Sequence, residues 1–174
     1  MRRLLLLRHS KTERPEPGER DRDRKLTERG RLDAPIIGAY MARHRFIPDR
    51  VLVSPAIRTR ETWELAAAAF AKTPPIVKDE RIYNAGADTL VELIRKTEDA
   101  RTLLVVGHNP GVHDLARRLI GSGDVEARES LNEKLPTSGL VVIDLAFDEW
   151  SKLHDRAGRL ERFISPRLIG AASD

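Results

Sequence analysis

Short apolar runs alternate with segments of helical spacing along most of the chain. "RRLLLLR" is apolar through its centre, as expected of a strand covered on both faces. Further strand candidates lie in "RVLVSP", "PPIVKD", "RTLLVVGHNP" and "SGLVVIDLAF", and "EWSKLH" with "GRLERFI" suggests a closing hairpin or edge strands. This alternation predicts an α/β three-layer sandwich, with a mostly parallel central sheet flanked by helices.

Helical spacing is clearest in "LTERGRLDAPIIGAYMARHRF". Thr27 is suited to the N-cap, and apolar side chains recur at Leu32, Ile36 and Tyr40. Pro35 lies inside this run, and proline removes a backbone donor and clashes with the preceding turn. We therefore expect this helix to kink or restart at Pro35.

Three more helices are expected, each directly after a strand or a loop. Ser54 can cap "AIRTRETWELAAAAF", with Pro55 in the first helical position. Asp88 can cap "TLVELIRKTED", and "GVHDLARRLIG" follows Asn109 and Pro110. With these crossovers between strands, the chain has the element order of a parallel sheet.

The length of 174 residues suits one domain with a good-sized core, and we expect a single domain over 1–174. The absence of cysteine excludes disulfides, thiolate nucleophiles and cysteine-based zinc sites. The four leucines near the start are too few for a signal peptide core or a membrane span. A cytoplasmic enzyme or binding protein, with no membrane partner, is the expectation.

The net charge of +4 raises the question of nucleic acid, but the charged residues do not favour it. The densest stretch, 13–31, mixes both signs almost evenly, as in a solvated loop and helix entrance. Two Tyr, four Phe and two Trp offer few platforms for stacking bases. A basic pocket for a small anion explains the charge as well. The segment 13–24 is either a lid that borders a cleft or a plain surface loop.

Chemically active residues follow three of the predicted strands. The first strand ends in Arg8 and His9, the second is followed by Arg58 on the first helical turn, and a later one ends at His108 and Asn109. Ligands of open parallel sheets bind beyond the carboxyl ends of the strands. We therefore expect two arginines and two histidines to meet at one edge, beside two helix N-termini.

Such a cluster needs an anion, because arginine stays charged and would otherwise repel its neighbours. A tetrahedral phosphoryl group fits, since guanidinium groups bind its oxygens in pairs and helix N-termini favour negative charge. Each residue alone has a plainer interpretation. Arg8 could pair with a carboxylate of 13–31, His9 could be a satisfied, partly buried histidine, Arg58 a surface residue and His108 a neighbour of a helix cap. The coincidence at three strand ends favours a site.

"LRHSKTE", "SPAIRTRET" and "VVGHNPG", in this order and spacing, resemble the histidine phosphatase (phosphoglycerate mutase-like) superfamily. The short chain and the "GHNPG" form are most similar to the SixA-type phosphohistidine phosphatases. The similarity covers nearly the whole chain, including "LPTSGLVVIDL".

The resemblance implies roles for the residues at the strand ends. His9 is the expected nucleophile and forms a phosphohistidine that water hydrolyses. Arg8, Arg58 and His108, with Asn109, are expected to hold the phosphoryl oxygens. His9 must attack as neutral imidazole, with its other ring nitrogen on a backbone carbonyl. The family needs no metal or other cofactor, because the arginines and the histidine supply the positive charge.

Two departures from the family pattern bear on the substrate. Ser10 stands where the family has glycine, which restricts close approach. Asn84 stands about where mutases and many phosphomonoesterases carry a glutamate proton donor, and Glu80 is near but out of register. A water or His108 remains a possible donor. Weak acid catalysis suits a leaving group that departs easily.

The sequence therefore predicts a metal-independent phosphatase acting on phosphohistidine protein or another labile phosphate. One alternative is a broad-specificity phosphomonoesterase of the same superfamily, with a small phosphorylated metabolite as its partner. A second is a phosphate-binding module without turnover. The presence of both His9 and His108 argues against the module, since binding alone needs no aligned nucleophile.

Overall fold

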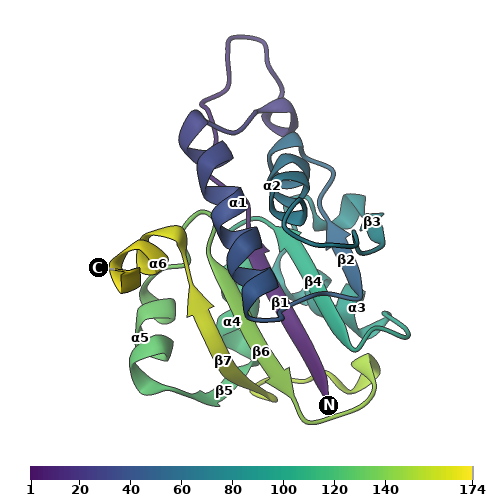
Figure 1. Ribbon diagram of the computed structural model, residues 1–174. Coiled ribbons are helices and arrows are strands. Elements are labelled where there is room, and N and C mark those ends of the chain that lie inside the picture. The colour runs from purple at the N-terminus through teal and green to yellow at the C-terminus, as the bar shows by residue number, and fades with distance from the viewer. Residues whose placement is uncertain (174) are drawn as a thin grey trace.

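The centre of the computed structural model, which describes residues 1–173, is a seven-stranded sheet in the order β3-β2-β4-β1-β6-β7-β5 (Figure 1). Within that range, β6 alone runs antiparallel to both its neighbours. The predicted α/β sandwich with a mostly parallel sheet is therefore confirmed. The strands are β1 (Arg2–Arg8), β2 (Arg50–Val53), β3 (Ile76–Lys78), β4 (Thr102–Gly107), β5 (Ile120–Gly123), β6 (Leu140–Leu145) and β7 (Gly158–Ile164).

The four leucines of β1 divide between two apolar layers, because neighbouring side chains of a strand point to opposite faces. Leu4 and Leu6 join the layer under α3 (Ala87–Arg95), α4 (Gly111–Leu119) and α5 (Val125–Glu133). Leu5 and Leu7 join the layer under α1 (Glu28–Arg43), α2 (Ile57–Ala67) and α6 (Pro166–Ser173). All four are fully buried, so β1 is packed on both faces at the centre of the sheet.

The helix starts differ in detail from the prediction. Thr27 caps α1 as expected, with its Oγ1 accepting from the N–H of Gly30. The expected restart at Pro35 is wrong, since α1 runs unbroken from Glu28 to Arg43. Two predicted caps are also wrong: α2 is preceded by Ala56 rather than Ser54, and α3 by Gly86 rather than Asp88. Three residues separate the end of β2 at Val53 from the start of α2 at Ile57, so Pro55 lies before the helix, whereas α3 begins at Ala87, one residue before the predicted cap.

The C-terminal half holds elements that the sequence pattern did not reveal. The predicted helix "GVHDLARRLIG" ends at Leu119, and the next four residues form β5 against β7. "EWSKLH" is not a strand, because Trp150–Lys152 form a short 3₁₀ helix. The indole of Trp150 is buried and donates its Nε1–H to the Ala100 carbonyl at 2.7 Å. Nor is β7 a closing edge, since it lies between β6 and β5.

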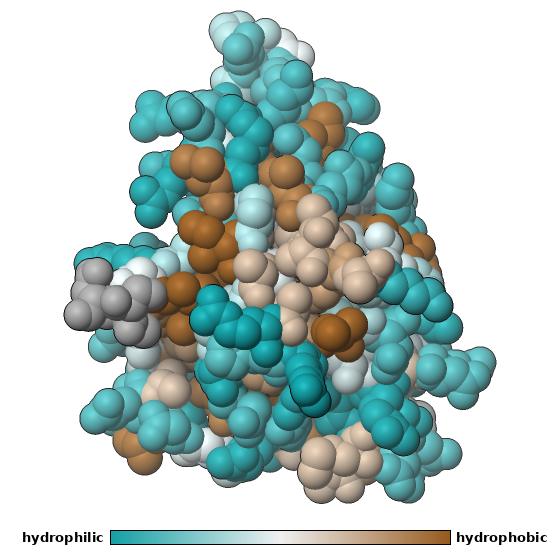
Figure 2. Space-filling model, viewed as in Figure 1, coloured by the Kyte–Doolittle hydropathy of each residue, from teal (hydrophilic) through white to brown (hydrophobic). Residues whose placement is uncertain are grey.

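The charged segment between β1 and α1 stands at the top of Figure 1. An isolated bridge from Thr12 to Leu26 closes its base, and Asp21–Asp23 form a 3₁₀ helix within it. Its surface in Figure 2 is mainly hydrophilic, while apolar atoms gather lower down, along α1. No helix within residues 1–173 combines the length and apolar character needed to cross a bilayer.

One close backbone approach brings the turn after β3 to the start of α4. A Cβ atom on Gly111 would lie 2.0 Å from the Ala85 carbonyl oxygen, so only glycine fits there. Tyr83 of the same turn lies beside His108, and the two ring centroids are 5.6 Å apart at a near-perpendicular angle.

Candidate active site

The predicted strand ends meet at one edge of the sheet. In the parallel register, Arg8 of β1 lies opposite Gly107 of β4, and Val53 of β2 lies opposite Val106. The rings of His9 and His108 therefore face each other, with centroids 5.4 Å apart and planes inclined by 55°. The structure thus brings together the two imidazoles that the sequence places 99 residues apart.

His9 has a defined tautomer. Its Nδ1 lies 2.8 Å from the Ser10 carbonyl oxygen, which can only accept, so Nδ1 carries the proton and Nε2 keeps its lone pair. Thr12 Oγ1 donates to the same carbonyl at 3.0 Å. Burial, opposed by the Ser10 carbonyl and aided by the positive charges of Arg8 and Arg58, lowers the pKa of His9 to about 4. At neutral pH the ring is therefore uncharged, with the lone pair of Nε2 free of a proton.

His108 is buried and held by one hydroxyl. Its Nε2 lies 2.7 Å from Ser54 Oγ, and Ser54 is fully buried. Burial first, then the positive charge of Arg58, lowers the pKa of His108 to about 3. Its Nδ1 is buried without a hydrogen-bond partner among residues 1–173. The strand-following Ser54, predicted as a helix cap, instead orients this histidine.

The two arginines approach from different elements. Arg8 donates from Nη1 to the Leu135 carbonyl at 3.1 Å, and burial lowers the pKa of its guanidinium. Its Nε is buried with no partner in the described chain. Arg58, 5% exposed, donates from Nη1 to the Asp21 carbonyl at 2.8 Å and from Nη2 to Asp21 Oδ2 at 3.0 Å. Both guanidinium groups are held in place.

Asn109 completes the cluster from the loop after β4. Its Nδ2 donates at 2.9 Å to the Leu135 carbonyl that also accepts from Arg8. Its Oδ1, like Arg8 Nε and His108 Nδ1, is buried with no partner in residues 1–173. A buried polar group without a partner costs about 1–3 kcal/mol. An oxyanion bonded to Arg8 Nε and to His108 Nδ1 in its N–H form would offset that cost, so the arrangement can bind an anion.

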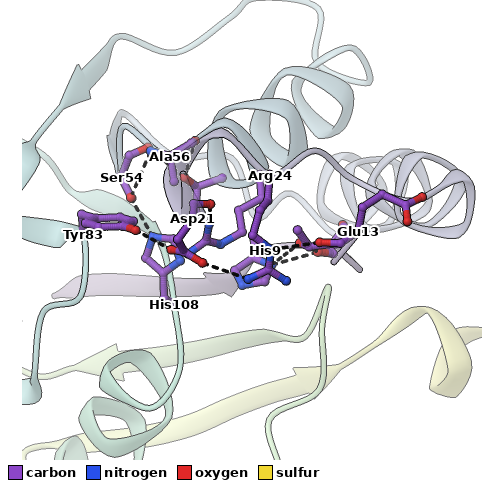
Figure 3. A network of polar contacts seen from close by, with 12 residues as sticks. His9, Glu13, Asp21, Arg24, Ser54, Ala56, Tyr83 and His108 are labelled. Atoms are coloured by element: carbon purple, nitrogen blue, oxygen red, sulfur yellow. Dashed lines mark hydrogen bonds and ion pairs between the residues drawn. The ribbon is translucent and has the colours of Figure 1, made fainter. Parts of the chain in front are cut away.

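Three residues that the sequence did not predict lie near the two histidines. They are Asp21 and Arg24 of the charged segment and Tyr83 of the turn after β3. Figure 3 shows Asp21 close to Tyr83 and Arg24, on the same side as His9 and His108. The carboxylate of Asp21 accepts from the Tyr83 hydroxyl, and from Arg24 Nη1 at 2.9 Å. These bonds hold the pKa of Asp21 well below its usual range. In the sequence, Asp21 is hidden in a run of alternating charges, and no periodicity marks it.

The remaining predicted residues lie in different surroundings. Glu80 is mostly exposed and forms an ion pair with Arg22 at 2.9 Å. Asn84 is exposed, with a left-handed backbone angle φ of 58°. Ser10 is fully buried, and its Oγ lies 2.6 Å from Ser138 Oγ. The structure thus gathers His9, His108, Arg8, Arg58 and Asn109 at one edge of the sheet, buries Ser10, and leaves Glu80 and Asn84 at the surface.

Residues 1–173 contain no group of three or more histidine, aspartate or glutamate side chains arranged to hold a metal ion. The positive groups described at this edge are the guanidinium groups of Arg8, Arg24 and Arg58.

Known proteins resemble this chain over almost all of its length. The family profile of the histidine phosphatase superfamily (branch 1) matches residues 4–86. An uncharacterized protein of Mycobacterium tuberculosis (strain H37Rv), Rv1276c, is 35% identical over 164 residues, which are 92% of this chain and 100% of the relative.

Solved structures give the same result. A candidate phosphohistidine phosphatase SixA from Agrobacterium tumefaciens has a TM-score of 0.81 and 35% identity, covering 95% of this chain and 98% of that one. A second candidate SixA, from Nakamurella multipartitia, has a TM-score of 0.82 and 25% identity, covering 95% and 96%. The chain therefore belongs to the histidine phosphatase superfamily and is of the SixA type.

Proposed function

We propose that this protein is a phosphatase that passes the phosphoryl group of its substrate through a covalent intermediate on His9. The observation that carries the proposal is the pair of facing rings. His9 has a free lone pair on Nε2, and the centroid of the His108 ring lies 5.4 Å from that of His9. A site for binding alone needs no nucleophile held in a single tautomer.

The first step is an in-line transfer. The lone pair on Nε2 of His9 attacks phosphorus, the bond from phosphorus to the leaving group breaks, and the leaving group departs with the bonding electrons. The guanidinium groups of Arg8 and Arg58 bind the equatorial oxygens, where charge accumulates in the transition state. Because these groups already supply positive charge, we propose that the reaction is independent of a metal ion.

The second step returns the enzyme to its starting state. A water attacks phosphorus, the bond from phosphorus to Nε2 breaks, and its electrons return to the ring of His9. The proton lost by the water ends on a phosphate oxygen, so inorganic phosphate leaves and His9 is neutral again. His108 binds the transferred group in both steps.

The ionisable groups at this edge favour a leaving group that departs easily. Burial and the charge of Arg58 lower the pKa of His108 to about 3, so at neutral pH its ring is neutral and has no extra proton to give to a leaving group. The pKa of Asp21 is lowered by its hydrogen bonds, and burial and Asp21 raise that of Tyr83. Asp21 and Tyr83, like His108, are therefore poor general acids. We therefore propose phosphohistidine protein or another labile phosphate as the substrate, ahead of stable phosphate esters.

Incubation with a labile phosphoryl donor such as phosphoramidate, followed by mapping of acid-labile, base-stable label, tests the proposal. We expect label on His9, and in H9A a loss of more than a thousandfold in kcat/KM, about 4 kcal/mol. The matched control is H154A, which removes an exposed histidine remote in sequence from the strand ends. Near wild-type activity in H9A would rule out the assignment.

A substrate panel separates the remaining alternatives. Phosphohistidine protein and acyl phosphate should be hydrolysed faster than nucleotides and sugar phosphates. Equal rates across the panel would indicate the broad-specificity phosphomonoesterase, and binding without turnover or label would indicate the phosphate-binding module. We further propose that residues 1–174 form one histidine phosphatase domain that acts in the cytoplasm.

A further inference from the structure

The charged segment delivers one carboxylate to the site, and every strong contact of that carboxylate is with a site residue. Asp21 lies in the 3₁₀ helix of the segment. Its carboxylate bonds to Arg58, Arg24 and Tyr83, and its backbone carbonyl accepts a second bond from Arg58. A residue 37 positions before Arg58 in the chain thus binds both terminal nitrogens of that guanidinium.

Burial shows which partner depends on the other. The side chain of Arg58 is 6% exposed, whereas that of Asp21 is 49% exposed. Arg58 is therefore a buried cation whose orientation is set from the solvent side by a loop residue. Tyr83 adds a cation–π contact, with its ring centroid 5.8 Å from the Arg58 guanidinium carbon. Because Tyr83 also bonds to Asp21, the same carboxylate holds both Arg58 and the aromatic ring beside it.

Asp21 does not occupy the position expected for the phosphoryl group. That position is marked by Arg8 Nε and His108 Nδ1, which are buried and unpartnered among residues 1–173. A carboxylate placed between the two histidine rings would bond to these atoms. Asp21 bonds instead to Arg58, with one hydrogen bond to each terminal nitrogen, and each of these nitrogens has a second N–H for a ligand.

We propose that Asp21 is a positioning residue for phosphoryl binding: it fixes the Arg58 guanidinium at the angle that the oxyanion requires. This inference rests on the proposed function in taking Arg58 as a phosphoryl ligand. The segment 13–24 is then part of the active site, and Asp21 acts on the phosphoryl group through Arg58.

The test is a double-mutant cycle of D21A and R58A, in which the dissociation constant for tungstate is measured for each protein. Tungstate is a tetrahedral oxyanion, and its binding can be measured without turnover. D21A should weaken tungstate binding about 10- to 100-fold, as removal of an orienting residue commonly does. In the R58A background, D21A should cause no further loss. With phosphoramidate as substrate, D21A should lower kcat more than it raises KM, because a misplaced ligand fails most in the transition state.

The matched control is D23N, two residues away on the same segment. Asp23 forms an ion pair with Arg20 at 2.8 Å, and its side-chain hydrogen bonds go to Arg20 rather than to the site. D23N should leave the tungstate affinity unchanged. Thermal melting of each variant shows whether it is folded, and D21N, which keeps the shape and one acceptor oxygen, replaces D21A if that variant is unfolded.

Three outcomes would overturn the inference. An unchanged affinity in D21A or D21N would show that Arg58 needs no orientation from the segment. Losses that add fully in the double variant would show that Asp21 does not act through Arg58. Tighter binding would show that the carboxylate competes with the oxyanion. Failure of the proposed function is distinct, because it would leave wild-type tungstate binding without label on His9.

Discussion

The two ends of β1 carry arginines with opposite surroundings. At the amino end, Arg3 donates from Nε to Asp144 Oδ1 at 2.6 Å and from Nη2 to Oδ2 at 3.0 Å, and this hydrogen-bonded ion pair raises its pKa. At the carboxyl end, burial lowers the pKa of Arg8, and its Nε has no partner in the described chain. One arginine has a permanent carboxylate partner. The other is held ready for an anion that the chain does not supply.

Hollow shape alone does not separate the two ends. A cavity of about 640 Å³ lies at the amino end, lined by Met1, Arg2, Arg3, Arg101, Thr102, Asp144 and Asp148. Both carboxylates of this cavity are paired, Asp144 with Arg3 and Asp148 with the N-terminal ammonium, while Arg2 Nε is buried without a partner among residues 1–173. The carboxyl end differs in its two neutral imidazoles, which lie beside the unpartnered Arg8 Nε, whereas the unpartnered Arg2 Nε at the amino end has no histidine in the lining of its cavity.

Replacing Arg8 by alanine should lower activity, whereas replacing Arg3 should lower only stability. R8A should lower kcat/KM about 100-fold or more, the usual cost of one transition-state donor, with little change in melting temperature. R3A should leave kcat/KM unchanged and cost about 1 kcal/mol or less of stability, because the pair is partly exposed. Steady-state kinetics and thermal unfolding of both variants check this. An activity loss in R3A as large as that in R8A would contradict it.

Acidification should affect the carboxyl end before the rest of the core. Burial lowers the pKa of His9 to about 4, below the value near 6.5 expected in the unfolded chain. Between these values the unfolded chain binds the proton and the folded one does not. The contribution of His9 to the free energy of unfolding is therefore fully present above pH 6.5 and is lost as the pH falls towards 4. Nuclear magnetic resonance titration of the His9 ring should give a midpoint near 4. A midpoint near 6.5 would show that the ring is not desolvated.

The smallest expected effect concerns the departure at Ser10. S10A leaves the hydroxyl of Ser138 buried without its partner and should cost about 1 kcal/mol of stability. The double variant S10A/S138A should recover most of this loss, because removing both partners of a buried hydrogen bond is nearly neutral. Denaturant unfolding of the wild type, S10A, S138A and S10A/S138A measures the coupling. Additive losses would show that the two hydroxyl groups do not depend on each other.

The sequence predicted what local patterns determine. The leucines of β1 and the apolar run of β4 each end where the pattern ends, so the amino-acid pattern alone places His9 and His108 at one edge of the sheet. By contrast, β5 could not be predicted, because Ile120–Gly123 contains two glycines and forms a strand only by pairing with β7. The apolar residues of "EWSKLH" suggested an edge strand, but the buried Trp150 anchors a 3₁₀ helix.

Asp21 shows the same limit within the site. Its neighbours "DRDR" carry alternating charges, and nothing in their spacing separates the residue that folds inward from those that stay in solvent. The direction depends on the bridge from Thr12 to Leu26 and on the buried position of Arg58, both of which are tertiary. Contacts between a loop and a buried arginine are therefore set by the fold and not by local spacing.

The claim that an oxyanion binds between His9 and His108 can be tested with crystals of the protein soaked in tungstate. The anomalous scattering of tungsten gives the position of the ion. We expect tungsten between the rings of His9 and His108, with its oxygens bonded to Arg8 Nε and to Arg58. Tungsten at the amino end beside Arg2, Arg3 and Arg101, with the space between the two rings unchanged, would contradict the account.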